Sequence, residues 1–257
     1  MTILCYHSVE SGWASPLAVP PGEFARHGAW LAANRKVLEL SRAVELLDSS
    51  FRLPRGATAL TFDDGFGSLF DKALPVILRC RLPATAFLVA ETLTPSGRAV
   101  DWVDNPPADP IRTLTLDQVL EMQRAGVRFG SHSYSHRDLP LLEERECERD
   151  LRTSRETLED LLGRPVPFLA YPRGRHDERV RRAAQRAGFT HAFTLPEKHE
   201  PVGRFAVPRV GVYPGNGAAA LRAKTSRAYL SIRASAAFPM LRSLVRGRRG
   251  SPPSLQG

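Results

Sequence analysis

Residues 57–65 read ATALTFDDG, a run of apolar and β-branched residues that ends in two carboxylates and a glycine. Such a run is typical of a buried strand, and the glycine permits a turn after it. In parallel α/β proteins the active site lies at the carboxyl ends of the strands, so Asp63 and Asp64 stand where catalytic groups are found. Alone, the motif is a weak signal, because an aspartate in this place also serves as a helix N-cap.

Outward from this run, short apolar segments alternate with helical patterns. We predict strands at residues 3–6, 36–40, 57–62, 84–89, 127–130, 168–171, 192–195 and 206–210. We predict helices at residues 23–34, 42–47, 68–79, 116–125, 143–162 and 178–187, with N-caps at Ser41 and Thr115 and ends at Gly126, Gly163 and Gly188. Repeated strand–helix units predict an α/β fold with a parallel sheet, and about seven strands favour closure into a barrel.

Length and charge divide the chain into two parts. The 257 residues suffice for one core, so we expect one catalytic domain at 1–217 and a basic tail at 218–257. The tail holds eight Lys and Arg and no acidic residue, whereas the net charge of the whole chain is +9. The body therefore has no basic excess, and we expect no nucleic-acid partner.

The tail mixes apolar residues with its cations, and we expect it to be partly helical with a disordered end. This mixture suits a segment that lies on an anionic membrane surface. The alternative is a helix packed on the barrel followed by a disordered basic end. Pro239 favours this alternative, because a proline interrupts the helical stripe of apolar residues.

The cysteines and the first residues bear on location. The three cysteines, Cys5, Cys80 and Cys147, are far apart and match neither a metal knuckle nor a disulfide framework. The first residues lack the pattern of a signal peptide, and no uncharged apolar run reaches the ~18 residues of a membrane span. We therefore interpret the cysteines as reduced thiols, and we expect a cytoplasmic protein that is either soluble or peripheral to the membrane.

His132 and His136 follow the predicted strand at 127–130. Two imidazoles four residues apart can reach a single ion, and zinc-type sites combine two histidines with one carboxylate, which Asp64 can supply. An isolated pair of this spacing is usually a surface feature, but two motifs at two strand ends are far more specific. We predict a divalent metal ion, with zinc preferred and cobalt, nickel or manganese also compatible.

The sequence TFDDG at 61–65 followed by HSYSH at 132–136 resembles the first two signatures of the NodB-homology polysaccharide deacetylases, carbohydrate esterase family 4. This resemblance extends over about residues 1–214 and implies a distorted (β/α)7-type barrel. It implies that Asp64, His132 and His136 hold the metal and that Asp63 is the general base. The implied reaction releases acetate from N-acetylhexosamine units of poly-, oligo- or lipid-linked saccharides.

Residues 170–174, AYPRG, resemble the third signature, which usually reads Arg-x-Pro-Tyr-Gly. The resemblance implies that Tyr171 and Arg173 contact the oxyanion or the substrate, with the backbone N–H of Arg173 in the place of the family tyrosine. Ala170 replaces the family arginine that steadies the base. Arg209 can substitute for that arginine, or it can be an ordinary solvated residue.

The sequence offers two candidates for the general acid. Residues 3–9, ILCYHSV, resemble the first strand of the biofilm poly-N-acetylglucosamine deacetylase branch, which implies that His7 is the acid. A packed strand-end histidine is the alternative, and His191 is the competing candidate. In the long loop at 91–113, Trp102 is either a platform for a sugar ring or a loop anchor.

Two other functions fit the same residues. One is hydrolysis of a non-sugar amide or cyclic imide on the same scaffold. The other is an inactive metal- or glycan-binding module, which Ala170 and the missing C-terminal histidine of the family suggest. The complete set of Asp63, Asp64, His132 and His136 argues against the inactive module.

Overall fold

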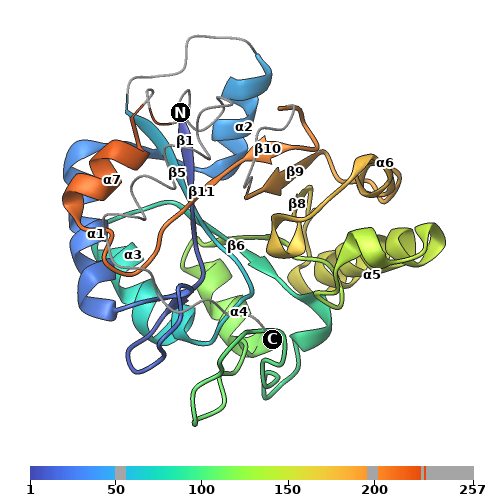
Figure 1. The fold of residues 1–257 in the computed structure, drawn as a ribbon, viewed down its shortest axis with the longest axis horizontal. Coiled ribbons are helices and arrows are strands. Elements are labelled where there is room, and N and C mark those ends of the chain that lie inside the picture. Colours follow the sequence, from blue (N-terminus) through green and yellow to red (C-terminus); the bar gives the residue numbers. More distant parts are fainter. Residues whose placement is uncertain (50–55, 196–201, 227–228, 230–257) are drawn as a thin grey trace, which may run out of the picture.

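A computed structural model describes residues 1–49, 56–195, 202–226 and 229. In these residues nine parallel strands form one sheet that curves into a nearly closed barrel with helices outside it (Figure 1). The strands are β1 (Thr2–Tyr6), β4 (Lys36–Leu38), β5 (Ala57–Phe62), β6 (Ala84–Leu88), β7 (Arg128–Ser131), β8 (Phe168–Ala170), β9 (His191–Thr194), β10 (Val207–Pro208) and β11 (Val210–Gly211). The predicted fold class is confirmed.

The last strands close the barrel. The order along the sheet is β10-β9-β8-β7-β6-β5-β1-β11, and β4 lies beside the first half of β5. β10 pairs with β9 at one edge, and β11 pairs with β1 at the other. Only Arg209 separates β10 from β11, so the chain at 207–211 joins the two edges of the sheet. Arg209 therefore lies at the seam of the barrel.

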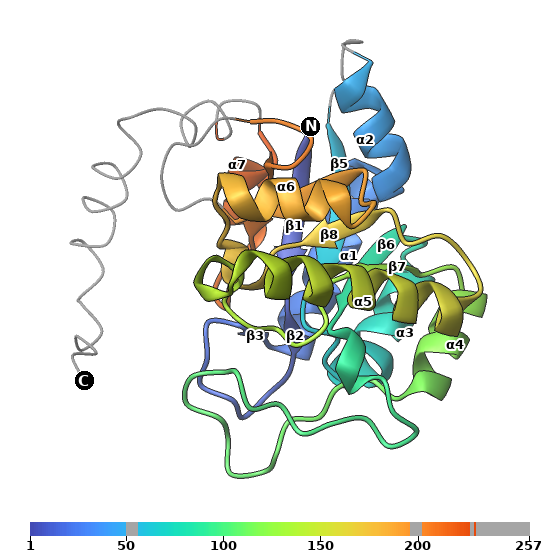
Figure 2. The ribbon, with the colours of Figure 1, turned by 90° about the vertical axis from the view of Figure 1, so that its right-hand side faces the viewer.

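The helices cover the outside of the sheet. They are α1 (Pro21–Asn34), α2 (Leu40–Asp48), α3 (Leu74–Arg79), α4 (Leu116–Arg124), α5 (Glu144–Leu162), α6 (Glu178–Arg186) and α7 (Ala218–Lys224). A small strand pair, β2 (Ser8–Val9) and β3 (Ala18–Val19), follows β1. In Figure 2, α5 and α6 lie side by side on one flank of the barrel.

Most of the predicted helix boundaries are close to the observed ones. The side chain of Thr115 caps α4, where it accepts a hydrogen bond from the Gln118 N–H in a capping box. Gly163 ends α5 in the left-handed conformation, with φ 64°. The N-cap predicted at Ser41 is wrong, because α2 already begins at Leu40 and Glu39 is its cap residue.

The core forms around the inner strands. β1, β5 and β6 are buried along their whole length, as expected for strands covered on both faces. Tyr6, Phe24 and Phe62 pack against one another with ring centroids 5.3–5.7 Å apart, which joins α1 to β1 and β5. Aromatic contacts of this kind each contribute about 0.5–1.5 kcal/mol beyond burial of their area. This packing fixes the ends of β1 and β5 that carry the candidate site.

The predicted tail starts inside the folded part of the molecule. α7 packs on α1, and its Leu221 is fully buried. Residues 230–257 lie outside the described part of the chain, so the predicted membrane contact of the tail and its disordered end stay predictions. Among the described residues, no helix is both long enough and apolar enough to cross a bilayer.

Candidate active site

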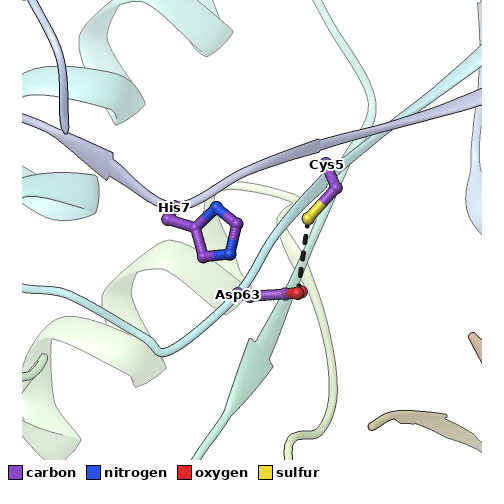
Figure 3. A group of neighbouring side chains, drawn as sticks. All are labelled: Cys5, His7 and Asp63. Carbon is purple, nitrogen blue, oxygen red and sulfur yellow. Dashed lines mark hydrogen bonds between the residues drawn. The ribbon is translucent and has the colours of Figure 1, made fainter. Parts of the chain in front are cut away.

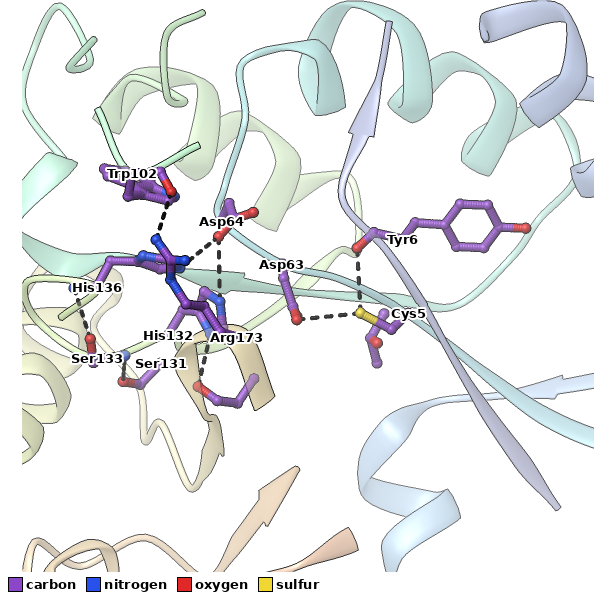
Figure 4. A network of polar contacts seen from close by, with 12 residues as sticks. Cys5, Tyr6, Asp63, Asp64, Trp102, Ser131, His132, Ser133, His136 and Arg173 are labelled. Atoms are coloured by element: carbon purple, nitrogen blue, oxygen red, sulfur yellow. Dashed lines mark hydrogen bonds and ion pairs between the residues drawn. The ribbon is translucent and has the colours of Figure 1, made fainter. Parts of the chain in front are cut away.

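The predicted site residues meet at one edge of the barrel. His7 directly follows β1, Asp63 and Asp64 follow β5, and His132 follows β7. All these strands are parallel, so their carboxyl ends open on the same side of the sheet. Figure 4 shows the side chains converging there from separate strands. The folded chain thus brings together residues that are more than a hundred positions apart.

The backbone at this edge is strained. In the described residues, six non-glycine residues have positive φ, and four of them belong to the site: Asp64 (68°), Ser133 (68°), His136 (55°) and Arg173 (57°). The left-handed region costs roughly 1–3 kcal/mol for such residues and is tolerated where the surroundings enforce it. The strained residues are therefore concentrated in the turns that orient the side chains of the site.

Asp64, His132 and His136 form a compact group of potential metal ligands. The Asp64 Oδ1 lies 3.1 Å from the His136 Nε2 and 3.4 Å from the His132 Nε2. All three donor atoms fall within 4.8 Å of one another, and all three residues are buried. Two imidazoles and one carboxylate are a ligand set that zinc-type ions use in catalytic sites, so the residues fit a divalent metal ion.

The orientation of His132 favours metal binding. Its Nδ1–H donates to the Ala170 carbonyl at 2.8 Å, which leaves Nε2 as the ring nitrogen that faces Asp64. Metal-ligating histidines usually donate their second N–H in this way, and the bond fixes the tautomer. The acceptor is a backbone carbonyl, so the replacement of the family arginine by Ala170 leaves this contact intact.

His136 is held differently. Its ring stacks on Trp102 with centroids 4.8 Å apart and planes at 28°. Its Nδ1 is buried and has no hydrogen-bond partner within the described ranges. Stacking on an indole therefore takes the place of the usual second hydrogen bond.

The electrostatics of the group favour a positive charge. Burial alone would raise the pKa of Asp64, but hydrogen bonds from His132 and His136 hold it well below its usual value. Burial also acts to lower the pKa of His132, yet the charges of Asp63 and Asp64 raise it above the ordinary value. The pKa of His136 is lowered, mainly by burial. His132 faces both carboxylates, which explains why the two histidines shift in opposite directions.

Serine hydroxyls support the turn that carries the two histidines. The Ser133 hydroxyl accepts from the His136 N–H at 2.9 Å, and the Ser131 hydroxyl accepts from the Ser133 N–H at 3.1 Å. The Ser131 hydroxyl also contacts the Ser154 hydroxyl at 2.6 Å, which ties the turn to α5. All three hydroxyls belong to buried residues.

Asp150 on α5 supports the same turn from the other side. Its carboxylate accepts from the Tyr134 N–H at 2.9 Å and from the Ser135 hydroxyl. Sequence reasoning missed both Asp150 and Ser154. Asp150 and Ser154 are four residues apart, so the sequence indicates that they lie close together on one face of a helix. Nothing in the sequence indicates what the two side chains contact.

Asp63 faces a different environment from Asp64. Arg209 donates to its two carboxylate oxygens at 2.6 and 2.7 Å. The Cys5 thiol lies 3.3 Å from Oδ2 (Figures 3 and 4). Burial would raise the pKa of Asp63, but the charge of Arg209 more than offsets it, so the pKa lies below the usual value. Burial also raises the pKa of the Cys5 thiol well above its usual value, which keeps the thiol protonated. Asp63 is thus an ionised, firmly held carboxylate.

Arg209 is not a solvated residue, so that alternative from the sequence was wrong. Its side chain is 0% exposed and lies inside the barrel, with the guanidinium 5.3 Å from the centre of the Phe87 ring. A two-point guanidinium–carboxylate contact fixes both partners in direction as well as distance. Arg209 therefore contacts Asp63 directly, and its role as a substitute for the motif arginine stays a prediction.

His7 lies on the same side as Asp63. One ring nitrogen, the Cys5 sulfur and an Asp63 oxygen all fall within 4.8 Å of one another (Figure 3). Burial lowers the pKa of His7, so the ring is mainly neutral at neutral pH. Its Nδ1 is buried without a hydrogen-bond partner in the described part of the chain. The His7 ring thus lies beside the Asp63 carboxylate, and its Nδ1 remains available for a hydrogen bond.

His191 lies away from this group. It is the first residue of β9, at the amino-terminal edge of the barrel, and its Nε2 lies 3.2 Å from Asp48 at the end of α2. Residues at the start of a parallel strand cannot reach groups beyond the carboxyl ends of its neighbours. The competing assignment of His191 as the acid is therefore wrong.

Tyr171 has a packed position in the structure, and its predicted contact with the oxyanion or the substrate stays a prediction. Its N–H donates to the Phe193 carbonyl at 3.1 Å, its hydroxyl donates to the Phe205 carbonyl at 3.1 Å, and its ring stacks on His176. The side chain is 0% exposed. Tyr171 is a core residue that joins β8 to β9.

Trp102 and Arg173 lie at the mouth of the site. The Trp102 carbonyl accepts from the Arg173 Nη2 at 3.1 Å, and one face of the indole covers His136 (Figure 4). The loop that carries Trp102 is also held by Trp13, whose indole N–H donates to the Asn105 carbonyl at 2.9 Å. Trp102 thus anchors its loop to the metal-ligand group, and a contact of Trp102 with a sugar ring stays a prediction.

Comparison with known proteins agrees with this geometry. The sequence model of the polysaccharide deacetylase family matches residues 52–192. YxkH of Bacillus subtilis, a candidate polysaccharide deacetylase by name, is 27% identical over 226 residues, which cover 87% of this chain and 75% of YxkH. The poly-β-1,6-N-acetyl-D-glucosamine N-deacetylase of Staphylococcus epidermidis is 24% identical over 208 residues, 75% of this chain and 67% of that protein.

A solved structure shows the same fold. The deacetylase PplD of Streptococcus pyogenes, determined in complex with acetate, superposes with a TM-score of 0.75 at 22% identity. The match covers 88% of this chain and 98% of PplD. The barrel described above is therefore present in a solved deacetylase structure.

Proposed function

We propose that this chain, which belongs to the polysaccharide deacetylase family, hydrolyses N-acetyl groups on N-acetylhexosamine units of a poly-, oligo- or lipid-linked saccharide and releases acetate. The observation that carries the proposal is the pair of adjacent aspartates in two separate environments. Asp64 faces two imidazoles, and Asp63 faces a guanidinium and a histidine. Metal-assisted hydrolysis needs this separation of a ligand from a base.

Asp64 and the Nε2 atoms of His132 and His136 would hold a divalent ion, with zinc as the first expectation. Such an ion supplies Lewis-acid polarisation of a carbonyl oxygen. The Ala170 carbonyl keeps His132 in the ligating tautomer, and Trp102 keeps the ring of His136 in place. The chain itself therefore provides the orientation of all three donors.

Asp63 would accept the proton of the attacking water. The lowered pKa keeps this carboxylate ionised at neutral pH, so it is ready to act as a base. Arg209 holds both oxygens, which restricts the direction from which a water can donate. Asp63 has no direct role in the ligand group, so its loss should affect turnover and leave the ion in place.

His7 would deliver a proton to the nitrogen that leaves when the C–N bond breaks. A general acid must reach the leaving nitrogen, and a ring that is neutral at the start, such as His7, must first receive the proton that Asp63 collects from the water. The His7 ring satisfies the second condition, because it lies within 4.8 Å of an Asp63 oxygen. The backbone N–H of Arg173, which follows β8 at the mouth of the site, would donate a hydrogen bond to the oxyanion.

The proposed substrate class is supported by the name of one relative, which acts on poly-β-1,6-N-acetyl-D-glucosamine. The direct test is acetate release by protein that has been stripped with a chelator and reloaded with zinc, cobalt, nickel or manganese. Oligomers of β-1,6- and β-1,4-linked N-acetylglucosamine are the substrates, and a linear amide and a cyclic imide without sugar are the controls.

We expect acetate from the sugar oligomers, dependence on added metal, and no turnover of the two controls. Turnover of the controls alone would favour the non-sugar amidase or imidase. A fully metal-loaded protein that binds the oligomers and hydrolyses none of the four compounds would favour the inactive binding module.

A further inference from the structure

One cation at the mouth of the site has no acidic partner among the described residues. Arg173 stands where the third signature usually has a tyrosine, and its side chain is exposed. Two neighbouring arginines of the motif loops are neutralised, since Arg137 pairs with Glu146 and Arg175 pairs with Asp138. Across the described residues, no carboxylate comes within the 4.0 Å of an ion pair from the Arg173 guanidinium.

The position of Arg173 is fixed by its surroundings. Its φ of 57° places it in a left-handed turn directly before Gly174. A Cβ at Gly174 would meet the Leu195 backbone nitrogen at 2.7 Å, so only glycine lets the turn pack this closely. The guanidinium then donates to the Trp102 carbonyl at 3.1 Å. The charge is therefore held beside the site by backbone packing and one hydrogen bond.

This guanidinium keeps most of its hydrogen-bonding capacity. A guanidinium has five N–H donors in a fixed fork, and the Trp102 carbonyl uses one of them. A planar, unpaired fork that faces a binding site suits a carboxylate or a phosphate, which accept two parallel bonds.

On the premise of the proposed function, we propose that the natural saccharide carries an oxyanion group, a phosphate or a carboxylate, close to the acetamide that is hydrolysed, and that the Arg173 side chain binds it. A tyrosine at this position would offer a single hydroxyl and no charge. Arg173 is thus a residue that sets specificity, separate from the role of its backbone N–H.

The experiment compares three sugars on metal-loaded protein: N-acetylglucosamine as the neutral reference, N-acetylglucosamine 6-phosphate, and N-acetylmuramic acid, which carries a carboxylate. Acetate release gives kcat/KM, and calorimetry gives binding. The variants are Arg173→Gln and Arg173→Lys, and the matched control is Arg175→Gln, two residues away on the same loop and already paired with Asp138.

We expect the wild type to prefer at least one acidic sugar over the neutral one. The ratio of kcat/KM for acidic and neutral sugar should fall roughly 10-fold or more in Arg173→Gln, the usual effect of losing a charge-assisted hydrogen bond. Arg173→Lys should keep part of the preference, and Arg175→Gln should keep all of it. Added salt should reduce the preference of the wild type. If the phosphorylated sugar loses its advantage over the neutral sugar in Arg173→Gln, the group is a phosphate. If N-acetylmuramic acid loses its advantage, the group is a carboxylate.

An unchanged ratio in Arg173→Gln, or a wild type that treats acidic and neutral sugars alike, would overturn the inference and leave the proposed function standing. If the wild type releases acetate from none of these monosaccharides, calorimetry decides the inference alone, and the oligomer assay decides the proposed function separately. In that case the binding of the acidic sugar, relative to the neutral one, must still weaken about 10-fold in Arg173→Gln.

Discussion

Asp63 and Asp64 are neighbours in the chain, and both are almost fully buried, yet they face two different halves of the site. The ligand half consists of Asp64 with His132 and His136, and it is supported by α5. The base half consists of Asp63 with Arg209, Cys5 and His7, and it is built on the seam where the barrel closes. Two identical side chains thus have different surroundings, and under the proposed function these surroundings give them different tasks. The predictions below separate the two halves.

Breaking the ligand half should have the largest effect. His132→Ala and His136→Ala should lose bound metal and acetate release together, because two remaining ligands are too few for a stable site. Elemental analysis after dialysis, combined with the acetate assay, measures both. The matched control is Cys5→Ser, which alters the base half and should keep its metal. Full metal occupancy in either histidine variant would remove that residue from the ligand set.

Removing the acid from the base half should come next. His7→Ala should retain metal and lower kcat by about 10²–10⁴-fold, the usual effect of losing a positioned proton donor. His191→Ala is the control, since that residue lies at the opposite edge of the barrel beside Asp48. A large loss in His191→Ala, with His7→Ala unaffected, would contradict the placement of the acid.

The base half should also respond to pH through Arg209. Arg209 lowers the pKa of Asp63, and activity requires the ionised carboxylate, so activity is lost as pH falls through that lowered pKa. In Arg209→Met burial remains and the charge is gone, so the acidic limb of the pH–rate profile should move to higher pH. Breaking a buried ion pair should also lower the free energy of unfolding by about 3–5 kcal/mol.

Arg209→Lys keeps a positive charge without the two-point contact, and it should shift the acidic limb less than Arg209→Met does. Denaturant unfolding of both variants checks the stability. An acidic limb that stays at the wild-type pH in Arg209→Met would show that Arg209 does not control the ionisation of Asp63.

The smallest effect should come from the support of the ligand half. Asp150→Ala removes the acceptor for the Tyr134 N–H and the Ser135 hydroxyl, so the turn with both histidines should lose rigidity. Metal affinity should weaken roughly 10-fold, as for other residues behind metal ligands. Asp160→Ala, an exposed site on the same helix, is the control. Equal metal affinity in the two variants would contradict a positioning role for Asp150.

The ligand half could be predicted from the sequence more fully than the base half, for a physical reason. His132 and His136 are four residues apart, and Asp64 ends an apolar strand, so short patterns place all three at strand ends. The contact of Asp63 with Arg209 spans 146 positions and depends on how the barrel closes. Family resemblance, and not spacing, suggested that pairing.

Other contacts had no signal in the sequence. Cys5 was interpreted only as a reduced thiol, because nothing in its local pattern indicates that the end of β5 lies next to it. Tyr171 was assigned to the site from its place in a motif, but its N–H serves the pairing of β8 with β9. The N-cap at Ser41 failed because the helix begins two residues earlier than predicted, and propensity alone does not resolve such a shift.

The separation of the two halves is tested most directly by paired variants of the two aspartates. Asp63→Asn and Asp64→Asn make the same chemical change at adjacent positions, and bound metal and acetate release are measured on the same samples. Asp63→Asn should keep the metal content of the wild type and release acetate about 10²–10⁴-fold more slowly, whereas Asp64→Asn should lose both. Equal metal loss in the two variants, or a wild-type rate in Asp63→Asn, would contradict the division into a ligand and a base.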